Sequence, residues 1–206
     1  HLKVDGFTFD TGPTFFLYPQ LLEEIFSQAG ANLKEEVEMV RLDPQYRLVF
    51  EDGPVLDATS DLAKMKKEVA KISEADSENL EAFMKGNAWK LEKLRPVLQK
   101  PFNNIFDLVD PNLFGALPAV RPWNSLDGDL KRYFKDPRTR LAFSFQSKYL
   151  GMSPYRCPSL FSILSGLEYE YGVFHPMGGC AEVSEAMARV ARRMGVKIHL
   201  DEPVQE

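Results

Sequence analysis

The residue types best suited to chemistry include a glycine pair near the end of the chain. Gly178 and Gly179 follow a strand-like phrase and precede an amphipathic helical pattern. Backbone N–H groups at the start of such a helix can face an anion or another ligand. On spacing alone, an ordinary tight turn with close helix packing is the favoured interpretation. A ligand site at this turn is therefore a hypothesis that needs a second observation.

A second glycine turn, Gly12-Pro13, ends a short alternating strand. Gly-Pro is a strong break in regular structure, and the turn follows Asp10 and Thr11. Asp10 is typical of a turn, but its carboxylate also suits a position beside a ligand. The residues alone leave both interpretations open.

Few other side chains suggest chemistry. Cys180 stands near a helix start that favours a thiolate, although a small buried side chain is the favoured interpretation. His1, His175 and His199 are scattered without metal-ligand spacing, so we expect no metal site. The chain has neither a Gly-x-Ser-x-Gly elbow nor a phosphate-loop lysine. We assign no catalytic acid or base.

Composition limits the class of protein. The 206 residues, with 44% hydrophobic and 27% charged side chains, are typical of a globular chain. A net charge of −5 without a basic block argues against a nucleic-acid partner. Two cysteines cannot form a disulfide framework, so we expect a reducing, cytoplasmic location. No apolar run approaches the roughly 20 residues of a membrane-spanning helix.

The elements that position these residues follow from hydrophobic periodicity. Three β-rich runs within residues 37–59, separated by Asp43-Pro44 and Asp52-Gly53-Pro54, predict a meander or a set of hairpins. Helices are predicted between Pro19 and Gly30 and over residues 62–72, 78–98, 126–134 and 137–150.

The last third of the chain has the clearest pattern. A strand over 172–175, a turn over 176–179, a helix that ends at Gly195 and a strand over 196–200 follow one another. This order is typical of an α/β crossover. The chain also starts within a strand-like phrase and stops after another, so we expect an internal piece of a longer protein.

Five phrases occur in an order typical of one family. They are Asp5–Thr14 (DGFTFDTGPT), Leu42–Arg47 (LDPQYR), Thr59–Met65 (TSDLAKM), Phe143–Tyr155 (FSFQSKYLGMSPY) and Pro176–Gly179 (PMGG), the last followed by a helix and Glu202-Pro203-Val204. Together they resemble the bacterial-type phytoene desaturases and related carotenoid desaturases and isomerases, which are FAD-dependent enzymes.

The resemblance implies a cofactor and its contacts. A member of this family binds FAD non-covalently and removes hydrogen from a long polyene by hydride transfer to the flavin. The loop near the flavin corresponds here to Asp10, Thr11, Gly12, Pro13 and Thr14. Val204 is expected to contact the adenine through its main chain. Gly178 and Gly179 are expected near the substrate and cofactor.

The resemblance also implies a mixed α/β and α+β fold in two parts. Residues 1–36 and 172–206 correspond to part of a Rossmann-like FAD-binding domain, and residues 37–171 to a substrate domain with a β-meander and helices. The dinucleotide fingerprint Gly-x-Gly-x-x-Gly is absent, since the family places it upstream of His1. We therefore expect the isolated chain to bind FAD weakly or not at all and to be inactive alone.

A polyene has few polar groups that a protein could recognise, so the tunnel that binds it should be lined by aromatic and aliphatic side chains. Candidate lining residues are Phe143, Phe145, Tyr149 and Phe161, although plain core packing is the favoured interpretation for any one of them. Because carotenoids dissolve in bilayers, we also expect peripheral membrane contact through the apolar segment 101–122, in short helical turns. The aromatic side chains expected to make this contact are Phe102, Phe106 and Phe114 within the segment, and Trp123 just after it.

Alternatives remain open at this level. A carotenoid isomerase, a retinol saturase-like enzyme or an amine-oxidase-like flavoenzyme shares the superfamily, and fold analogy does not separate them. A rival of another class is a non-catalytic module that binds lipid surfaces through segment 101–122. The sequence specifies neither the carotenoid, nor the final electron acceptor, nor the oligomeric state.

Overall fold

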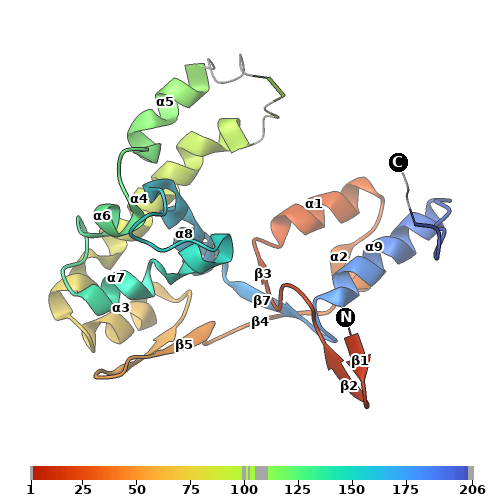
Figure 1. The fold of residues 1–206 in the computed structure, drawn as a ribbon, viewed down its shortest axis with the longest axis horizontal. Helices are drawn as coiled ribbons and strands as arrows, with labels where there is room; N and C mark the ends of the chain where they lie inside the picture. Colours follow the sequence, from red (N-terminus) through yellow and green to blue (C-terminus); the bar gives the residue numbers. More distant parts are fainter. Residues whose placement is uncertain (1, 99–100, 102, 105–110, 204–206) are drawn as a thin grey trace. The chain divides into compact units, whose positions relative to one another are not determined.

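Strand β7 (Val173–Pro176) lies at the centre of a three-stranded sheet, between β3 (Phe16–Leu17) and β4 (Met39–Arg41), and is antiparallel to both. The computed structural model (Figure 1) describes residues 2–98, 101, 103–104 and 111–203. It divides into two units, residues 1–42 with 173–206 and residues 43–172. The first unit thus combines segments from both ends of the chain.

Three helices complete the core of the first unit. They are α1 (Gln20–Gln28), α2 (Leu33–Glu36) and α9 (Ala181–Arg193). The apolar face of α9 packs with α1 and α2 because its buried residues recur at helical spacing. The buried cluster consists of Phe26, Leu33, Val37, Val183, Ala186 and Val190. The charged face of α9 also contacts α2, since Arg189 and Arg193 pair with Glu36.

A separate hairpin precedes the sheet. Strands β1 (Leu2–Val4) and β2 (Phe7–Phe9) pair in the register Val4↔Phe7. The two residues between them, Asp5 and Gly6, have φ of 50° and 82°. Positive φ at both central residues defines the turn class for which Asp-Gly is favoured. Local turn chemistry therefore accounts for this hairpin.

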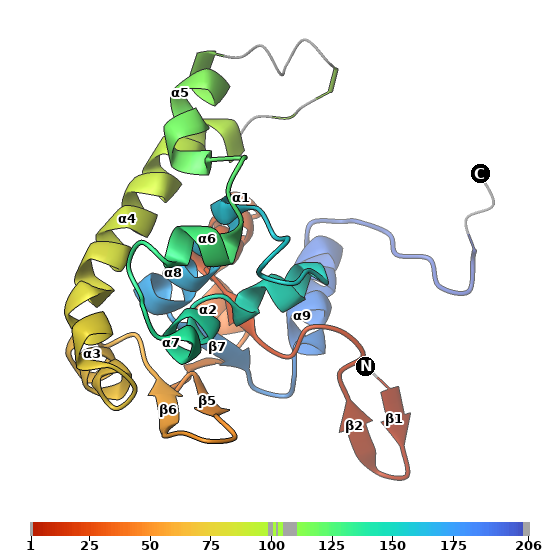
Figure 2. The ribbon, with the colours of Figure 1, turned by 60° about the vertical axis from the view of Figure 1, so that its left-hand side comes forward.

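The second unit is mainly helical. It contains the strands β5 (Tyr46–Val49) and β6 (Val55–Ala58), the α-helices α3 (Leu62–Ala70), α4 (Glu74–Leu98), α5 (Pro111–Val120), α6 (Leu126–Leu130), α7 (Pro137–Ala142) and α8 (Ser162–Tyr171), and the 3-10 helices η2 (Phe145–Leu150) and η3 (Ser159–Phe161). Figure 2 shows α5 alongside the C-terminal part of α4, in agreement with their contacts.

Side-chain caps explain where several of these helices begin. The carboxylate of Asp61 accepts the Lys64 N–H at 3.0 Å, which satisfies a free donor at the start of α3. At α6, Ser125 Oγ accepts the N–H of Gly128 at 3.1 Å. Each cap is a polar residue that directly precedes the predicted apolar pattern.

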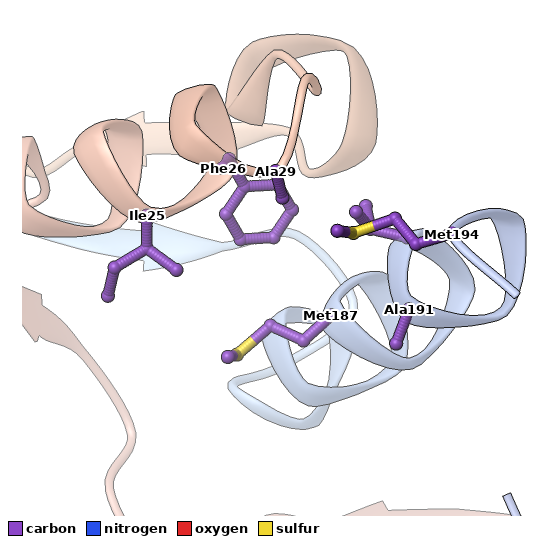
Figure 3. A pocket seen from close by; sticks show the side chains of 7 residues that line it. Ile25, Phe26, Ala29, Met187, Ala191 and Met194 are labelled. Atoms are coloured by element: carbon purple, nitrogen blue, oxygen red, sulfur yellow. The ribbon is translucent and has the colours of Figure 1, made fainter. Parts of the chain in front are cut away.

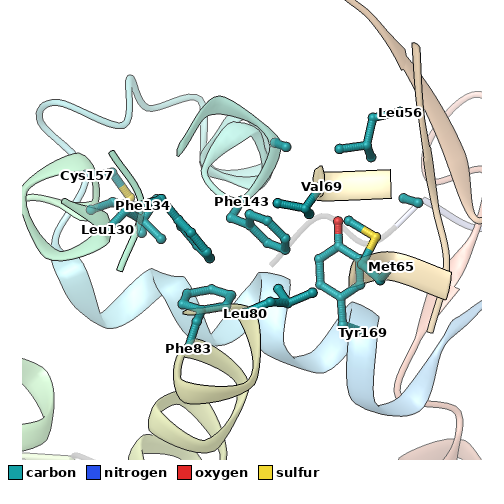
Figure 4. Close-up of a cluster of buried hydrophobic side chains, with 13 residues drawn as sticks. Leu56, Met65, Val69, Leu80, Phe83, Leu130, Phe134, Phe143, Cys157 and Tyr169 are labelled. Carbon is teal, nitrogen blue, oxygen red and sulfur yellow. The ribbon is translucent and has the colours of Figure 1, made fainter. Parts of the chain in front are cut away.

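An aromatic cluster forms the core of the second unit (Figure 4). Phe134 stacks on Phe143 with ring centroids 4.9 Å apart, and Phe83 meets both rings at 5.2 and 5.1 Å. Tyr169 of α8 lies 5.1 Å from Phe143. The cluster joins α4 to α8 and to the segment between α6 and η2, so these elements form one core.

The prediction of a meander or a set of hairpins over 37–59 is confirmed only for one hairpin, β5 with β6, and the meander is wrong. β5 pairs with β6, whereas β4 pairs with β7. Leu42 continues this pairing, since its N–H donates to the Val173 carbonyl at 2.9 Å. The residue after Asp43 is Pro44, which has no N–H to donate and separates β4 from β5. Residues 39–41 therefore lie with the first unit, not with the predicted substrate domain.

The predicted strand over 196–200 is also wrong. These residues are irregular, and Val196 and Leu200 are 52% and 72% exposed. An alternating pattern becomes a strand only beside a partner strand, and the described residues provide none here. Because β7 is antiparallel to both neighbours, the described part of the chain also lacks the predicted parallel crossover.

Two predicted helices are shorter than expected. The first ends at Leu130 rather than residue 134, and the second ends at Ala142 and continues as the 3-10 helix η2. The mixed α/β character is confirmed, with small sheets and many helices, while the Rossmann-like assignment stays a prediction. Within the described ranges, none of the helices combines the length and apolarity required to cross a bilayer.

Candidate functional site

The loop Asp10–Thr14 connects the β1–β2 hairpin to β3 in the first unit. Thr11, Gly12, Pro13 and Thr14 are exposed, whereas Asp10 is half-buried. The middle of the loop therefore presents backbone and small uncharged side chains to its surroundings.

The turn between β7 and α9 requires glycine at two positions. Gly178 and Gly179 have φ of +89° and +97°, a region that other residues rarely adopt. A Cβ atom built on Gly178 would lie 2.9 Å from Cγ of Glu182, and one on Gly179 would lie 2.8 Å from Oδ2 of Asp10. The second glycine thus allows the loop to approach the turn closely.

A hydrogen bond connects the loop to the helix. The Asp10 carboxylate accepts the Cys180 N–H at 2.9 Å, at the N-terminal end of α9. The four N-terminal N–H groups of a helix have no partner within it, and a carboxylate there is also favoured by the helix dipole. Asp10 is therefore a loop residue that caps a helix distant in the sequence.

The other end of the loop is held by a histidine. Nδ1 of His175 lies 2.8 Å from the Thr14 carbonyl oxygen, which can only accept, so Nδ1 carries the proton and donates. Strand pairing brings the two residues together, since Phe16 is opposite Phe174. Asp10 and His175 thus attach the two ends of the loop to one continuous segment, β7 and the turn after it.

The structure therefore brings together the two glycine turns that the sequence analysis treated separately. Sequence reasoning missed His175, which it regarded as one of three scattered histidines. Only the register between β3 and β7 places it at Thr14, and no local pattern reports that register. Val204, the predicted adenine contact, lies outside the described residues.

Cys180 is poorly suited to act as a nucleophile. Its thiol pKa is raised by burial and by the negative charge of Asp10. The pKa of the other cysteine, Cys157, is also raised by burial. Helix starts that activate cysteine lower its pKa instead, so the helix N-terminus of α9 does not produce a thiolate here.

The charges around the loop indicate which part of a flavin cofactor it fits. Two carboxylates, Asp10 and Glu182, lie at the start of α9, where they oppose a bound phosphate. By contrast, the exposed stretch Thr11-Gly12-Pro13 has no charge and allows close approach of its backbone. The residues present therefore suit the uncharged ring system of a flavin better than its pyrophosphate, and contact of the loop with the flavin stays a prediction.

The four aromatic residues among the predicted substrate contacts lie in two environments of the second unit. Phe143 is 0% exposed within the aromatic cluster (Figure 4). Phe161 packs against that cluster. Phe145 and Tyr149 belong to η2, where Phe145 meets the Tyr46 ring edge-on at 4.9 Å and Tyr149 is 39% exposed. Phe143 alone of the four is fully buried, since Phe161 is half-buried like Phe145, and contact with substrate stays a prediction for all.

A buried acid beside η2 escaped the sequence analysis. Glu168 of α8 is 0% exposed, and its carboxylate accepts hydrogen bonds from Gln146 at 2.8 Å and from Tyr149 at 2.9 Å. Burial raises the pKa of Glu168, and hydrogen bonds from Gln146, Tyr149 and Tyr46 oppose that rise. The sequence of α8 does not single out Glu168, because Ser162 and Ser165 are also buried and the buried face is not uniformly apolar.

Two further features add no chemistry. Among the residues that the structure describes, three or more His, Cys, Asp or Glu side chains do not gather where a metal ion could bind. An apolar pocket of about 110 Å³ lies between α1 and α9 in the first unit (Figure 3). Its lining consists of Ile25, Phe26, Ala29, Met187, Val190, Ala191 and Met194, which supply packing surface and no reactive group.

Comparison with known proteins tests the resemblance that the sequence motifs suggested. The chain is 36% identical over 204 residues to a 4,4'-diapophytoene desaturase (4,4'-diapolycopene-forming) of Methylomonas sp. It is 33% identical over 205 residues to a zeta-carotene-forming phytoene desaturase of Myxococcus xanthus, and 36% identical over 210 residues to a phytoene desaturase of Neurospora crassa. The resemblance inferred from the sequence motifs is thereby confirmed.

These matches cover 99%, 99% and 100% of this chain but only 40%, 40% and 35% of the three relatives. The chain thus spans about two fifths of the length of the curated relatives it matches. The model of the flavin containing amine oxidoreductases matches residues 2–206, nearly the whole chain. The chain belongs to the family of flavin-containing amine oxidoreductases.

Proposed function

We propose that the full-length protein is an FAD-dependent carotenoid desaturase that introduces double bonds into a long polyene such as phytoene. The observation that carries the proposal is the Asp10–Thr14 loop, attached at both ends to the segment 173–180. This loop corresponds to the loop that lies near the flavin in the family. Its exposed surface is uncharged, which suits the uncharged part of that cofactor. The relatives named above are desaturases of carotenoid precursors, which supports the substrate class.

The chemistry requires little of this chain beyond positioning. When bound, the flavin supplies the two-electron oxidant that accepts a hydride as a saturated C–C bond of the polyene becomes a double bond. Asp10 and His175 keep the loop in place, and Gly179 permits its close approach to the turn. The second hydrogen leaves the polyene as a proton released to water, which balances the two-electron oxidation.

Within this proposal, the first unit is part of a Rossmann-like FAD-binding domain and the second unit is part of a substrate domain. Phe145 and Tyr149 of η2 and Phe161 of η3 are the proposed polyene contacts, since all three are aromatic and incompletely buried. Phe143, the fourth aromatic residue of the predicted set, lies in the buried core.

We also propose that the protein meets its substrate at a membrane surface as a peripheral protein. Helix α5 (Pro111–Val120) carries no charged side chain, and it exposes Phe114 by 57%. Trp123, just after the helix, is 75% exposed. Exposed aromatic groups on an uncharged helix suit the boundary between headgroups and acyl chains. Phe102 and Phe106, also expected there, lie outside the described residues.

The test is turnover by the purified full-length protein, supplied with FAD and with phytoene in liposomes. We expect a yellow protein whose products have longer conjugated systems, resolved by chromatography and visible absorption. A product that is only isomerised would instead support the isomerase alternative. A colourless protein that sediments with liposomes without converting phytoene would support the lipid-binding alternative. Either result would contradict the proposed desaturase.

A further inference from the structure

Glu168 has no part in the proposed chemistry, yet it is fully buried and its carboxylate accepts three side-chain hydrogen bonds. Its Oε2 accepts from Gln146 Nε2 at 2.8 Å and from the Tyr46 hydroxyl at 3.1 Å, and its Oε1 accepts from the Tyr149 hydroxyl at 2.9 Å. An ionised carboxylate can only accept, and three donors converge on this one. The arrangement therefore matches the ionised form of Glu168.

The position of Glu168 is fixed by its neighbours. Its backbone carbonyl accepts from Gln45 Nε2 at 2.7 Å and from the Gly172 N–H at 2.9 Å. The Tyr46 and Tyr169 hydroxyl oxygens are 2.8 Å apart, which connects the donor Tyr46 to the same helix as Glu168. Because the carboxylate cannot readily move, the elements that bond to it are held relative to α8.

Helix η2 is the element that depends most on these bonds. A 3-10 helix has poorer backbone hydrogen bonds than an α-helix, and η2 ends at Gly151 with φ of 66°. Gln146, which is 1% exposed, attaches the first turn of η2 to Glu168. Tyr149, which is 39% exposed, attaches its last turn. The hydrogen bond from the Tyr149 hydroxyl to Glu168 thus fixes the orientation of the exposed part of the Tyr149 ring.

The bond between Tyr149 and Glu168 is linked to protonation. Burial raises the pKa of Glu168, whereas the hydrogen bond from Tyr149 lowers it. By linkage, a bond that favours the ionised acid must weaken when the acid takes up a proton. Among the described residues, the titratable or charged groups that act on Glu168 are Tyr46 from β5, Lys148 and Tyr149 from η2, and Tyr169 from α8.

We propose that Glu168 is a positioning residue for the substrate-facing side of the second unit: when ionised it holds η2 and Tyr149 in place, and when protonated it releases them. The proposal rests on the proposed function in one respect, that Tyr149 contacts the polyene. The hydrogen bonds that attach η2 to α8 do not depend on that contact, so the two parts can be tested separately.

Hydrogen exchange of the full-length protein tests the attachment itself. Protection of residues 145–150, corrected for intrinsic exchange, should fall as the pH is lowered from about 8 to about 5, a range that covers a raised carboxyl pKa. In Glu168→Gln this protection should not depend on pH. In Tyr149→Phe it should be about tenfold lower at the upper pH, since one bond to a charged group is lost. The control Glu170→Gln, at an exposed position of α8, should follow the unmodified protein.

Equal pH profiles in the unmodified protein and in Glu168→Gln would overturn the proposal. If Glu168→Gln does not fold, Tyr149→Phe decides, because it removes only the hydroxyl of a partly exposed side chain. Unchanged protection in that variant would also overturn the proposal.

Turnover tests the link to substrate. In the unmodified protein the KM for phytoene in liposomes should rise toward acid pH with a smaller change in kcat, and Glu168→Gln should lose this pH dependence. If exchange depends on Glu168 but KM does not, the substrate-positioning role is overturned while the desaturase proposal stands. If the unmodified protein converts no phytoene, the proposed function fails, and the exchange experiment still decides whether Glu168 holds η2.

Discussion

The Asp10 carboxylate occupies the space that a side chain at residue 179 would need: a Cβ atom built on Gly179 would lie 2.8 Å from Oδ2 of Asp10. The same oxygen accepts the Cys180 N–H at 2.9 Å. A loop and a turn separated by about 170 residues are thus complementary in shape and in hydrogen bonding.

This contact predicts the effect of Gly179→Ala. The new methyl group meets Asp10, and φ of +97° is strained for alanine, so we expect a loss of about 1–3 kcal/mol in the free energy of unfolding. The amount of flavin bound by the full-length protein should decrease as well. Thermal unfolding and the flavin-to-protein absorbance ratio measure the two effects.

Gly12→Ala is the matched control for this prediction. A Cβ built on Gly12 has no described atom within 4 Å, and its φ lies outside the strained region. The free energy of unfolding should therefore change by less than about 0.5 kcal/mol. If Gly179→Ala also leaves the free energy of unfolding unchanged, the close approach of Asp10 is not required.

A buried ion pair in the second unit predicts an asymmetry between two variants. Lys90 and Asp129 are 4% and 1% exposed and bonded to each other. Asp129→Ala leaves a buried ammonium group without its carboxylate, which should cost about 3–5 kcal/mol. Lys90→Met should cost less, because Asp129 keeps Arg132 at 3.1 Å and Arg121 at 3.3 Å.

Urea denaturation of both variants measures this asymmetry. The control is Lys85→Gln on the same helix as Lys90, which removes an exposed pair with Glu81 and should change stability little. Equal losses for Asp129→Ala and Lys90→Met would show that the two arginines do not compensate.

Local signals account for the part of the fold that the sequence predicted. Helix α9 follows its glycine turn as expected, because its apolar spacing and its flanking glycines act over a few residues. The pairing of β4 with β7 joins Val40 to His175, and no pattern in either strand specifies the other. The alternation over 196–200 predicted a strand that the described residues do not contain, since a strand also needs a partner.

The candidate site, like the fold, was predicted from the sequence only in part. The family motif identified the loop from Asp10 to Thr14 and the pair Gly178-Gly179, but it did not show that they meet. His175 and Glu168 were missed because both act through partners far away in the sequence, Thr14 in one case and Tyr46 in the other. Their roles follow from tertiary hydrogen bonds and not from residue type or spacing.

The raised pKa of Glu168 predicts a pH dependence of global stability that is opposite in sign to that of the η2 attachment, because burial, which favours the protonated acid, outweighs the hydrogen bonds that favour the ionised acid. A carboxyl group whose pKa is higher in the folded state stabilises the fold fully below its ordinary pKa of about 4.3, and this contribution is lost as the pH rises through the folded value. The free energy of unfolding of the unmodified protein, minus that of Glu168→Gln, should therefore decrease from acid toward neutral pH.

Denaturation of both proteins across this pH range provides the measurement. Other acids act in the opposite direction, since arginine and lysine neighbours lower the pKa of Asp127 and Asp136, but they are present in both proteins and cancel in the difference. A difference that stays constant or increases with pH would contradict a raised pKa for Glu168.

The membrane proposal predicts the behaviour of two exposed aromatic residues. The double variant Phe114→Ser with Trp123→Ser should sediment less with liposomes, because both side chains are largely exposed and neither is needed for the core. Bound flavin should be unchanged. The control Tyr155→Ser removes another aromatic group that is 72% exposed. If the double variant and the control sediment alike, this helix has no membrane role.

The most direct test of the central claim is a single anaerobic turnover of the flavin-loaded full-length protein with phytoene in liposomes. We predict that the visible flavin absorbance bleaches at the same rate as a longer conjugated polyene forms, with one new double bond for each flavin bleached. A flavin that stays oxidised while phytoene remains unchanged would contradict the assignment of this chain to a carotenoid desaturase.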